Sequence, residues 1–216
     1  MDGYATENEQ LEAFKHWWKK NGTLTSVVLT LIIAGLIGAQ WWRTQTVAQS
    51  EAASTEYQQL IQGLSRNDAQ VVQQHAARII SQFSSTPYAP LAAFALAKIK
   101  LEQGDKKAAR THLQWVLDNV NQPALEALAR LRLAKIIFSE GEYPVALGLL
   151  SVGSSGDSTD NQSSFTADYE ELKGDISLAM KNTSEARAAY TKALAALSEN
   201  TQKRTQLQMK LDDIGG

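Results

Sequence analysis

The stretch LKGDISLAMKNTSEARAAYTKAL at residues 172–194 decides the fold, because it holds two helical segments joined by a short polar turn. The small residues Gly174 and Ala186 lie within the two segments, and Tyr190 follows Ala186 by about one turn. Small residues allow two helices to cross closely, and a large side chain fills the space beside the crossing. The stretch therefore predicts a helical hairpin.

The same arrangement recurs earlier in the chain. Gly104 and Gly141, which are 37 residues apart, each end a helical segment, and the next interval in this register is 40 residues. The matching small residues are Ala97, Ala134 and Gly174 on the first helices and Ala109, Ala146 and Ala186 on the second, with Leu113, Leu150 and Tyr190 four residues later. A repeat of this length is typical of helical repeat arrays.

These residues resemble the tetratricopeptide repeat, although the two earlier pairs lack the Trp and Tyr that this repeat has on its first helix.

The expected helix boundaries follow from local residues. Asp105 can cap one helix, and Pro123 suits the first turn of another. We expect helix pairs at 91–103 with 106–119, 123–140 with 143–150, and 165–180 with 184–198, and a final helix at 201–214. A weaker pair before them would use Ala76, Ile80, Phe83 and Pro87. The expected fold class is all-α, with one N-terminal transmembrane helix followed by a tetratricopeptide-like array of helical hairpins.

The transmembrane helix is expected from residues 24–42, which form a run of 19 residues without a charge. Such a helix is roughly 28 Å long, close to the thickness of a bilayer's hydrocarbon core. Trp17 and Trp18 precede the run and Trp41 and Trp42 end it, at the depths where indole rings favour the headgroups. A cleaved signal peptide is the alternative, but its apolar region is normally shorter and ends near small residues.

Basic residues predict the orientation of this helix. Lys15, Lys19 and Lys20 precede it, whereas Arg43 is the single basic residue close behind it. The positive-inside rule then places the N-terminus in the cytoplasm and the large C-terminal part outside. We divide the chain into a cytoplasmic tail (1–22), a transmembrane helix (23–42), a membrane-proximal helix (43–64) and a repeat domain (65–216) with a flexible Ser/Gly-rich loop at 151–164.

Small residues recur every four positions within the membrane run, at Ser26, Thr30, Ala34 and Gly38. In lipid, such a strip lets another helix approach closely. It predicts packing against a membrane partner or a second copy. The alternative is that small residues are simply common in membrane spans.

No feature of the sequence indicates an enzyme. The chain has no Cys, which excludes thiolate catalysis, disulfides and sulfur-ligated zinc. Its three His are scattered, and no phosphate-binding Gly-rich loop or nucleophile motif is present. We expect no catalytic residue, cofactor or metal, and the net charge of −2 gives no reason to expect nucleic-acid binding.

A protein-binding groove is the remaining expectation. First helices line the concave face of such an array, and this face commonly binds partners. By register, the expected lining residues are Phe94, Lys98, Leu101, Leu131, Lys135, Phe138, Glu171, Asp175 and Leu178. Each of the Lys residues could equally be an ordinary solvated side chain.

The whole chain resembles the YfgM-like ancillary subunits of the Sec translocon. The resemblance rests on YATENEQLEAFKHWWKKNG at 4–22, WWR at 41–43 and ARLRLAKI at 129–136. It implies a bacterial inner-membrane protein with a periplasmic domain, and partners comprising the SecYEG translocon, the periplasmic chaperone PpiD and exported polypeptides. Such a protein would link exported polypeptides to periplasmic chaperones. The loop at 151–164 is longer than is usual in the family.

Two other functions remain open. One is a scaffold for assembly of the cell wall or the outer membrane, because repeat arrays also serve such roles. The other is a regulator whose cytoplasmic tail binds a soluble factor, in which case residues 1–22 would be necessary and the repeats dispensable.

Overall fold

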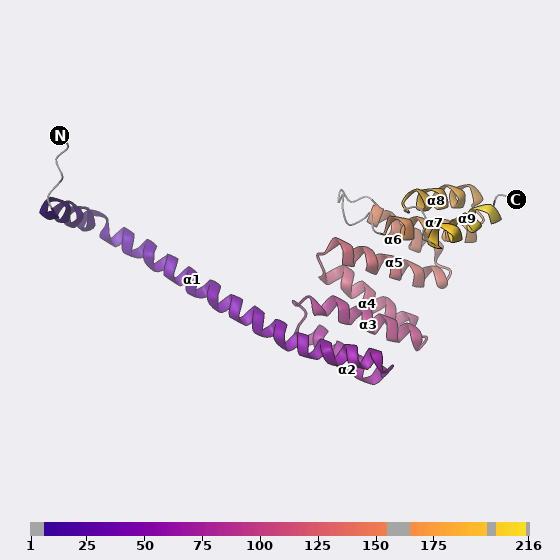
Figure 1. Ribbon diagram of the computed structural model, residues 1–216, viewed down its shortest axis with the longest axis horizontal. Coiled ribbons are helices and arrows are strands. Elements are labelled where there is room, and N and C mark those ends of the chain that lie inside the picture. The colour runs from indigo at the N-terminus through magenta and orange to yellow at the C-terminus, as the bar shows by residue number, and fades with distance from the viewer. Residues whose placement is uncertain (1–6, 155–164, 198–201, 215–216) are drawn as a thin grey trace. The chain divides into compact units, whose positions relative to one another are not determined.

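The computed structural model describes residues 7–154, 165–197 and 202–214, and these residues form nine helices and no strand (Figure 1). The expected all-α class is confirmed. The chain divides within helix α1 (Glu7–Ser65) into two compact units, Met1–Ala52 and Ala53–Gly216. Most of the Ser/Gly-rich loop expected at 151–164 lies outside the described residues.

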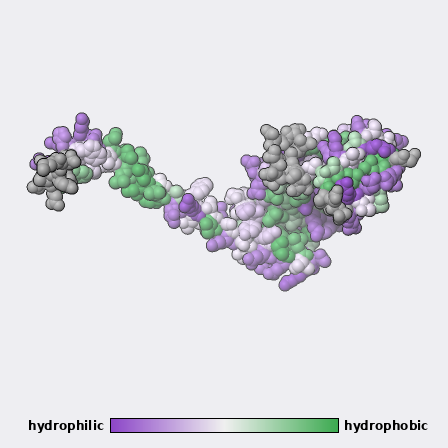
Figure 2. All heavy atoms as spheres, turned by 45° about the horizontal axis from the view of Figure 1, so that its top comes forward, coloured by the Kyte–Doolittle hydropathy of each residue, from purple (hydrophilic) through white to green (hydrophobic). Residues whose placement is uncertain are grey.

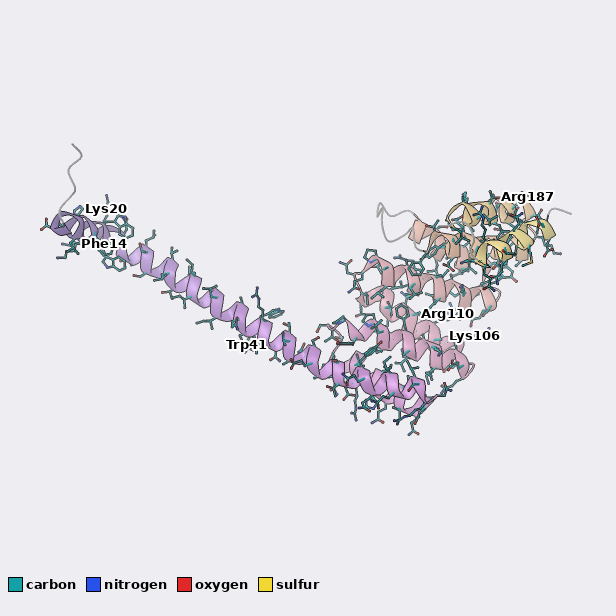
Figure 3. All side chains as sticks on the ribbon, in the orientation of Figure 1. Phe14, Lys20, Trp41, Lys106, Arg110 and Arg187 are labelled. Carbon is teal, nitrogen blue, oxygen red and sulfur yellow. The ribbon has the colours of Figure 1, made fainter. Side chains whose placement is uncertain are left out.

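The first unit contains an apolar helix with an exposed surface. In the described part of the chain, the helix over Phe14–Ser65 is long and apolar enough to cross a membrane. Only 6% of its most apolar window is buried, whereas the core helix of a globular domain would be mostly buried. Figure 2 shows these residues as a hydrophobic band along the helix, and Trp41 projects outward from it (Figure 3).

The second unit is a stack of helical hairpins (Figure 1). Leu60, near the C-terminal end of α1, shares a buried apolar cluster with α2. The remaining helices are α2 (Ala69–Gln82), α3 (Tyr88–Glu102), α4 (Lys106–Asn119), α5 (Pro123–Ser139), α6 (Tyr143–Ser154), α7 (Thr166–Ala179), α8 (Thr183–Ala195) and α9 (Gln202–Asp213). The pairs α3–α4, α5–α6 and α7–α8 are those expected from the sequence.

Helix boundaries follow from local chemistry. The Asp105 side chain accepts a hydrogen bond from the Ala108 N–H (2.9 Å), as expected of an N-cap, and Pro123 opens α5. Each hairpin turn contains one residue in the left-handed region, and the equivalent residues are Asn67, Gly104, Gly141 and Lys181 (φ 53° to 83°). Asn67 precedes Gly104 by 37 residues, so the end of α1 and α2 form a fourth pair in register.

The first pair reverses the sizes of the residues at its crossing. Leu60 occupies the site of Ala97 on the first helix, and Ala76 occupies the site of Leu113 on the second. All of these residues except Ala97, which is 2% exposed, are fully buried. A large residue on one helix and a small one on the other fill the crossing equally well in either order.

Candidate protein-binding grooves on the helical repeats

A groove lies between α3 and α5 and is named here the first-helix groove. It encloses about 480 Å³ and is lined by Phe94, Ala97, Lys98, Leu101, Glu102, Leu113, Arg132, Lys135, Ile136 and Ser139. The structure thus brings together four of the nine residues expected to line a groove, Phe94, Lys98, Leu101 and Lys135. Arg132 was not among the expected residues, because the register placed only Leu131, Lys135 and Phe138 of α5 on the groove face.

The first-helix groove combines an apolar floor with positive charge. Its Lys98 ammonium lies 3.7 Å from the Glu102 carboxylate, and the guanidinium of Arg132 lies 4.9 Å from the centre of the Phe94 ring. Neither Arg132 nor Lys135 has a carboxylate partner among the described residues. Burial lowers the pKa of Arg132, because removing water disfavours its charged form.

Two further expected residues do not line this groove. Leu131 is only 4% exposed and belongs to the central apolar cluster, which also contains Leu172 and Ile176 of α7. Phe138 is partly buried, with its ring centre 5.7 Å from that of Tyr143. Leu131 therefore belongs to the core shared by neighbouring hairpins, and Phe138 packs within its own hairpin.

The last three expected residues lie on α7, where α9 covers two of them. Lys210 bonds to Glu171 (2.9 Å) and to Asp175 (2.7 Å), and Lys203 also contacts Glu171 (3.2 Å). Burial opposes ionisation of Glu171, but Lys210 and then Lys203 outweigh it and lower the pKa of this carboxyl group. Leu178 is 39% exposed. The face of α7 in this register is thus occupied by the chain's own last helix.

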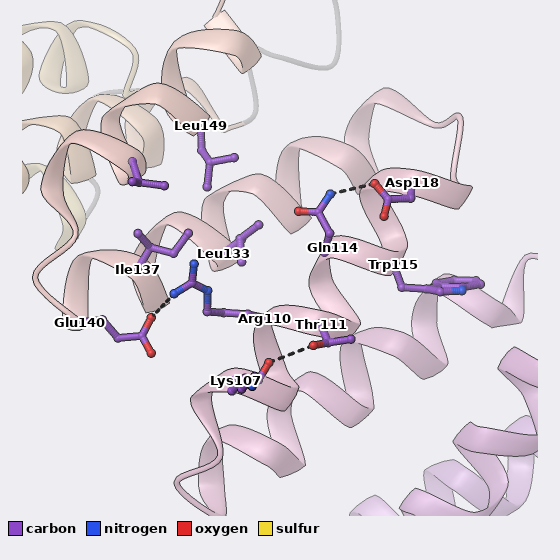
Figure 4. Close-up of a pocket in the computed structure, with 11 residues that line it drawn as sticks. Lys107, Arg110, Thr111, Gln114, Trp115, Asp118, Leu133, Ile137, Glu140 and Leu149 are labelled. Carbon is purple, nitrogen blue, oxygen red and sulfur yellow. Dashed lines mark hydrogen bonds and ion pairs between the residues drawn. The ribbon is translucent and has the colours of Figure 1, made fainter.

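A second groove lies between α4, α5 and α6, and the sequence did not indicate it (Figure 4). It encloses about 850 Å³, and its apolar wall includes Leu133, Ile137 and Leu149. The Arg110 guanidinium crosses it and lies 2.7 Å from a carboxylate oxygen of both Glu140 and Glu142. A signal for this groove was available in α6, which has no charged residue over Tyr143–Ser154.

The small residues of the membrane run lie exposed on α1. Ser26, Thr30, Ala34 and Gly38 are all exposed, and the Thr30 hydroxyl donates to the Ser26 carbonyl (2.8 Å) within its own helix. Nothing lies within 4 Å of the position that a Cβ at Gly38 would take. The strip therefore presents an open surface, and its role as a packing face stays a prediction.

The described residues hold no group of three or more His, Asp or Glu arranged to bind a metal ion. Some of their ion pairs lie within one helix, such as Lys98–Glu102, and others connect neighbouring elements, as Arg110 (labelled in Figure 3) does between α4 and Glu140 in the turn after α5 (Figure 4).

Comparison with known proteins agrees with the fold. A family model described as a tetratricopeptide repeat-like domain matches residues 15–216. No solved structure shows a significant match to this chain.

Several curated relatives align with the chain nearly end to end, and each of these is named ancillary SecYEG translocon subunit. The relative from Haemophilus influenzae is 30% identical over 212 residues, covering 98% of this chain and 99% of its own length. Those from Neisseria gonorrhoeae (25% over 215 residues, 99% and 100%) and Escherichia coli (26% over 219 residues, 99% and 99%) align similarly. With the repeat-like domain matched over most of its length, this chain belongs to the family of ancillary SecYEG translocon subunits.

Proposed function

We propose that this chain is a membrane-anchored, non-enzymatic interaction subunit that associates with the SecYEG translocon. The observation that carries the proposal is the end-to-end alignment with relatives named for this association. The architecture supports it, because one apolar helix can anchor the chain beside a membrane channel and a repeat array offers surfaces for polypeptides.

The proposed topology places the anchor in the bacterial inner membrane with its N-terminus in the cytoplasm. In this arrangement residues 1–22 form the cytoplasmic tail, 23–42 span the bilayer, 43–64 continue outward, and 65–216 form the periplasmic repeat domain. Lys15, Lys19 and Lys20 support this orientation, because basic residues are retained on the cytoplasmic side.

The strip of small residues and the first-helix groove would then bind different partners. The strip of Ser26, Thr30, Ala34 and Gly38 would pack against a helix of the channel, since close packing drives helix association in lipid. The first-helix groove would contact exported polypeptides or the periplasmic chaperone PpiD. The chain would thereby link polypeptides leaving the channel to periplasmic folding factors.

Site-specific photocrosslinking in living cells tests this proposal. Photoreactive residues would replace Thr30 and Gly38 on the strip and Lys98 and Lys135 at the groove, all of which are exposed. The matched control is Ile37, which is 65% exposed on the same helix but lies outside the strip. Adducts are identified by mass spectrometry.

We expect channel subunits to crosslink to the strip more strongly than to Ile37, and PpiD or exported chains to crosslink to the groove. Adducts to cell-wall or outer-membrane proteins alone would contradict the proposal and favour an envelope scaffold. A chain that retains function without its repeats, but not without residues 1–22, would instead favour regulation through the cytoplasmic tail.

A further inference from the structure

We propose that the first-helix groove is selective for acidic polypeptide segments, whose apolar side chains rest on its floor while their carboxylates bind Arg132 and Lys135. The inference rests on the proposed function, which makes this groove a contact site for polypeptides, and it specifies the chemistry of the segment that binds.

The charge of the groove is the first argument. Its lining carries three cations, Lys98, Arg132 and Lys135, and a single carboxylate, that of Glu102. This carboxylate forms an ion pair with Lys98 (3.7 Å). Three other arginines of the second unit lie against carboxylates: Arg78, Arg110, and Arg130, which is 3.1 Å from Glu126. Among the described residues Arg132 and Lys135 have no such partner, so the groove presents two uncompensated cations.

The position of Arg132 is the second argument. Its guanidinium packs over the Phe94 ring at 4.9 Å, which restricts its orientation, and it has no carboxylate partner among the described residues. Partial burial lowers the pKa of Arg132, and the residue is still exposed at the groove. A guanidinium in this position can hold a bound carboxylate through two parallel hydrogen bonds.

The apolar floor identifies the rest of the ligand. Phe94 and Ile136 lie at the base of the groove and are nearly buried, whereas Leu101 at its side is 40% exposed. An apolar side chain bound there would cover Leu101 and remove more apolar surface from water. The combination of floor and charge suits a polypeptide in which acidic and apolar residues are neighbours.

The spread of the cations favours internal acidic residues over a chain's terminal carboxylate. Arg132 and Lys135 are neighbours three residues apart on α5, and Lys98 lies across the groove on α3. A terminal carboxylate supplies one negative charge at one point. A segment with two or more acidic residues can place one carboxylate on Arg132 and another on Lys135.

The test uses the full chain in nanodiscs of neutral lipid. Its probes are a short fluorescent peptide in which glutamates flank leucines, and two counterparts with glutamine or lysine in place of glutamate. Binding is measured by fluorescence anisotropy at low and high salt. We expect the acidic peptide to bind about tenfold more tightly than the glutamine peptide at low salt, and the difference to shrink as salt rises.

Substitutions then assign the preference to the groove. R132Q/K135Q is expected to abolish the preference for the acidic peptide, and R132E/K135E to favour the lysine peptide. R66Q/K192Q neutralises two exposed cations outside the groove and should leave the preference intact. Circular dichroism melting checks that each variant folds like the wild-type chain, and the reversed preference of R132E/K135E cannot arise from unfolding.

Equal affinity of the wild-type chain for the acidic and glutamine peptides would overturn the proposal. So would an acidic preference that survives R132Q/K135Q, or binding of anionic vesicles alone, which would identify a lipid surface as the occupant. The translocon association is judged separately, by whether the strip at Thr30 and Gly38 still crosslinks to channel subunits in the R132Q/K135Q variant.

Discussion

At the scale of single residues, Tyr190 closes the last hairpin, α7–α8. Its ring lies against Gly174, where an added Cβ would be only 2.5 Å from the ring's Cδ1, and its hydroxyl donates to the Asp175 carboxylate (2.7 Å). Burial raises the pKa of Tyr190, and the hydrogen bond to Asp175 raises it further. The phenol therefore stays protonated and keeps donating at any ordinary pH.

Substitution of Gly174 tests this packing. G174A would force the buried Tyr190 ring or the helices to move, so we expect the free energy of unfolding to fall by about 1–3 kcal/mol. The control is G148A on α6, where nothing lies within 4 Å of an added Cβ; this helical position should gain about 0.5–1 kcal/mol. Urea denaturation followed by circular dichroism measures both. Equal effects of the two substitutions would contradict the tight crossing at Gly174.

The Glu171 carboxylate predicts a dependence on pH. Its pKa in the folded chain is lower than the ordinary value of 4.5, so its ionised form stabilises the fold. This contribution is complete above pH 4.5 and is lost as the pH falls through the lower, folded-state pKa. We expect E171Q to be less stable than the wild-type chain at pH 7, by about 1 kcal/mol, and the gap to close in acid. E185Q, at an exposed site on α8, should show no such gap in urea denaturation at either pH.

At the scale of elements, α9 acts as the final cover of the array. It buries one large apolar side chain, Leu207, against Ala186, Tyr190 and Ala193 of α8, and its lysines reach the carboxylates of α7. Its contacts with its neighbours are thus one fully buried apolar side chain, the partly buried Leu211, and a set of ion pairs and side-chain hydrogen bonds. Such a helix should be the least protected part of the second unit.

Truncation of the anchor tests the attachment of α9. L207A removes a fully buried side chain, and we expect a loss of about 2 kcal/mol, with faster hydrogen exchange in α9 but not in α3 or α4. M209A is the matched control, because Met209 lies on the same helix and is 54% exposed. If L207A accelerated exchange throughout the array, α9 would be an integral part of one cooperative core.

Physical reasons explain why the sequence predicted the three later helix pairs clearly and the first pair less clearly. Glycines with φ above zero and the cap at Asp105 act locally, so the three later pairs were recognisable. The first pair was indistinct, because Leu60 and Ala76 reverse the usual sizes while filling the same volume. The residues that line the groove were harder to predict. Register places Leu131 and Glu171 on the same face as Phe94. It does not show that Leu131 is buried in a cluster with residues of α7, or that Glu171 forms ion pairs with α9.

At the scale of the whole molecule, the proposed topology makes a prediction that needs no partner. The chain has no Cys, so single cysteines can be introduced and labelled without labelling at native cysteines. E12C would lie in the cytoplasm and K192C in the periplasm, and both residues are exposed. In intact cells with a permeable outer membrane, a maleimide that cannot cross the inner membrane should label K192C alone, and both sites after lysis. Labelling of E12C alone in intact cells would indicate the opposite orientation, with the N-terminus in the periplasm.

The four left-handed turn residues, Asn67, Gly104, Gly141 and Lys181, also define a unit of construction. The first two intervals between them are both 37 residues, each running from the turn of one hairpin to the turn of the next. Contacts in such arrays are made between adjacent repeats, so one interval can be copied with its interfaces preserved. The array can therefore be lengthened by whole hairpins, and each copy inserted between α3 and α5 would move Lys98 away from Arg132 while leaving the cover helix α9 in place on α7 and α8.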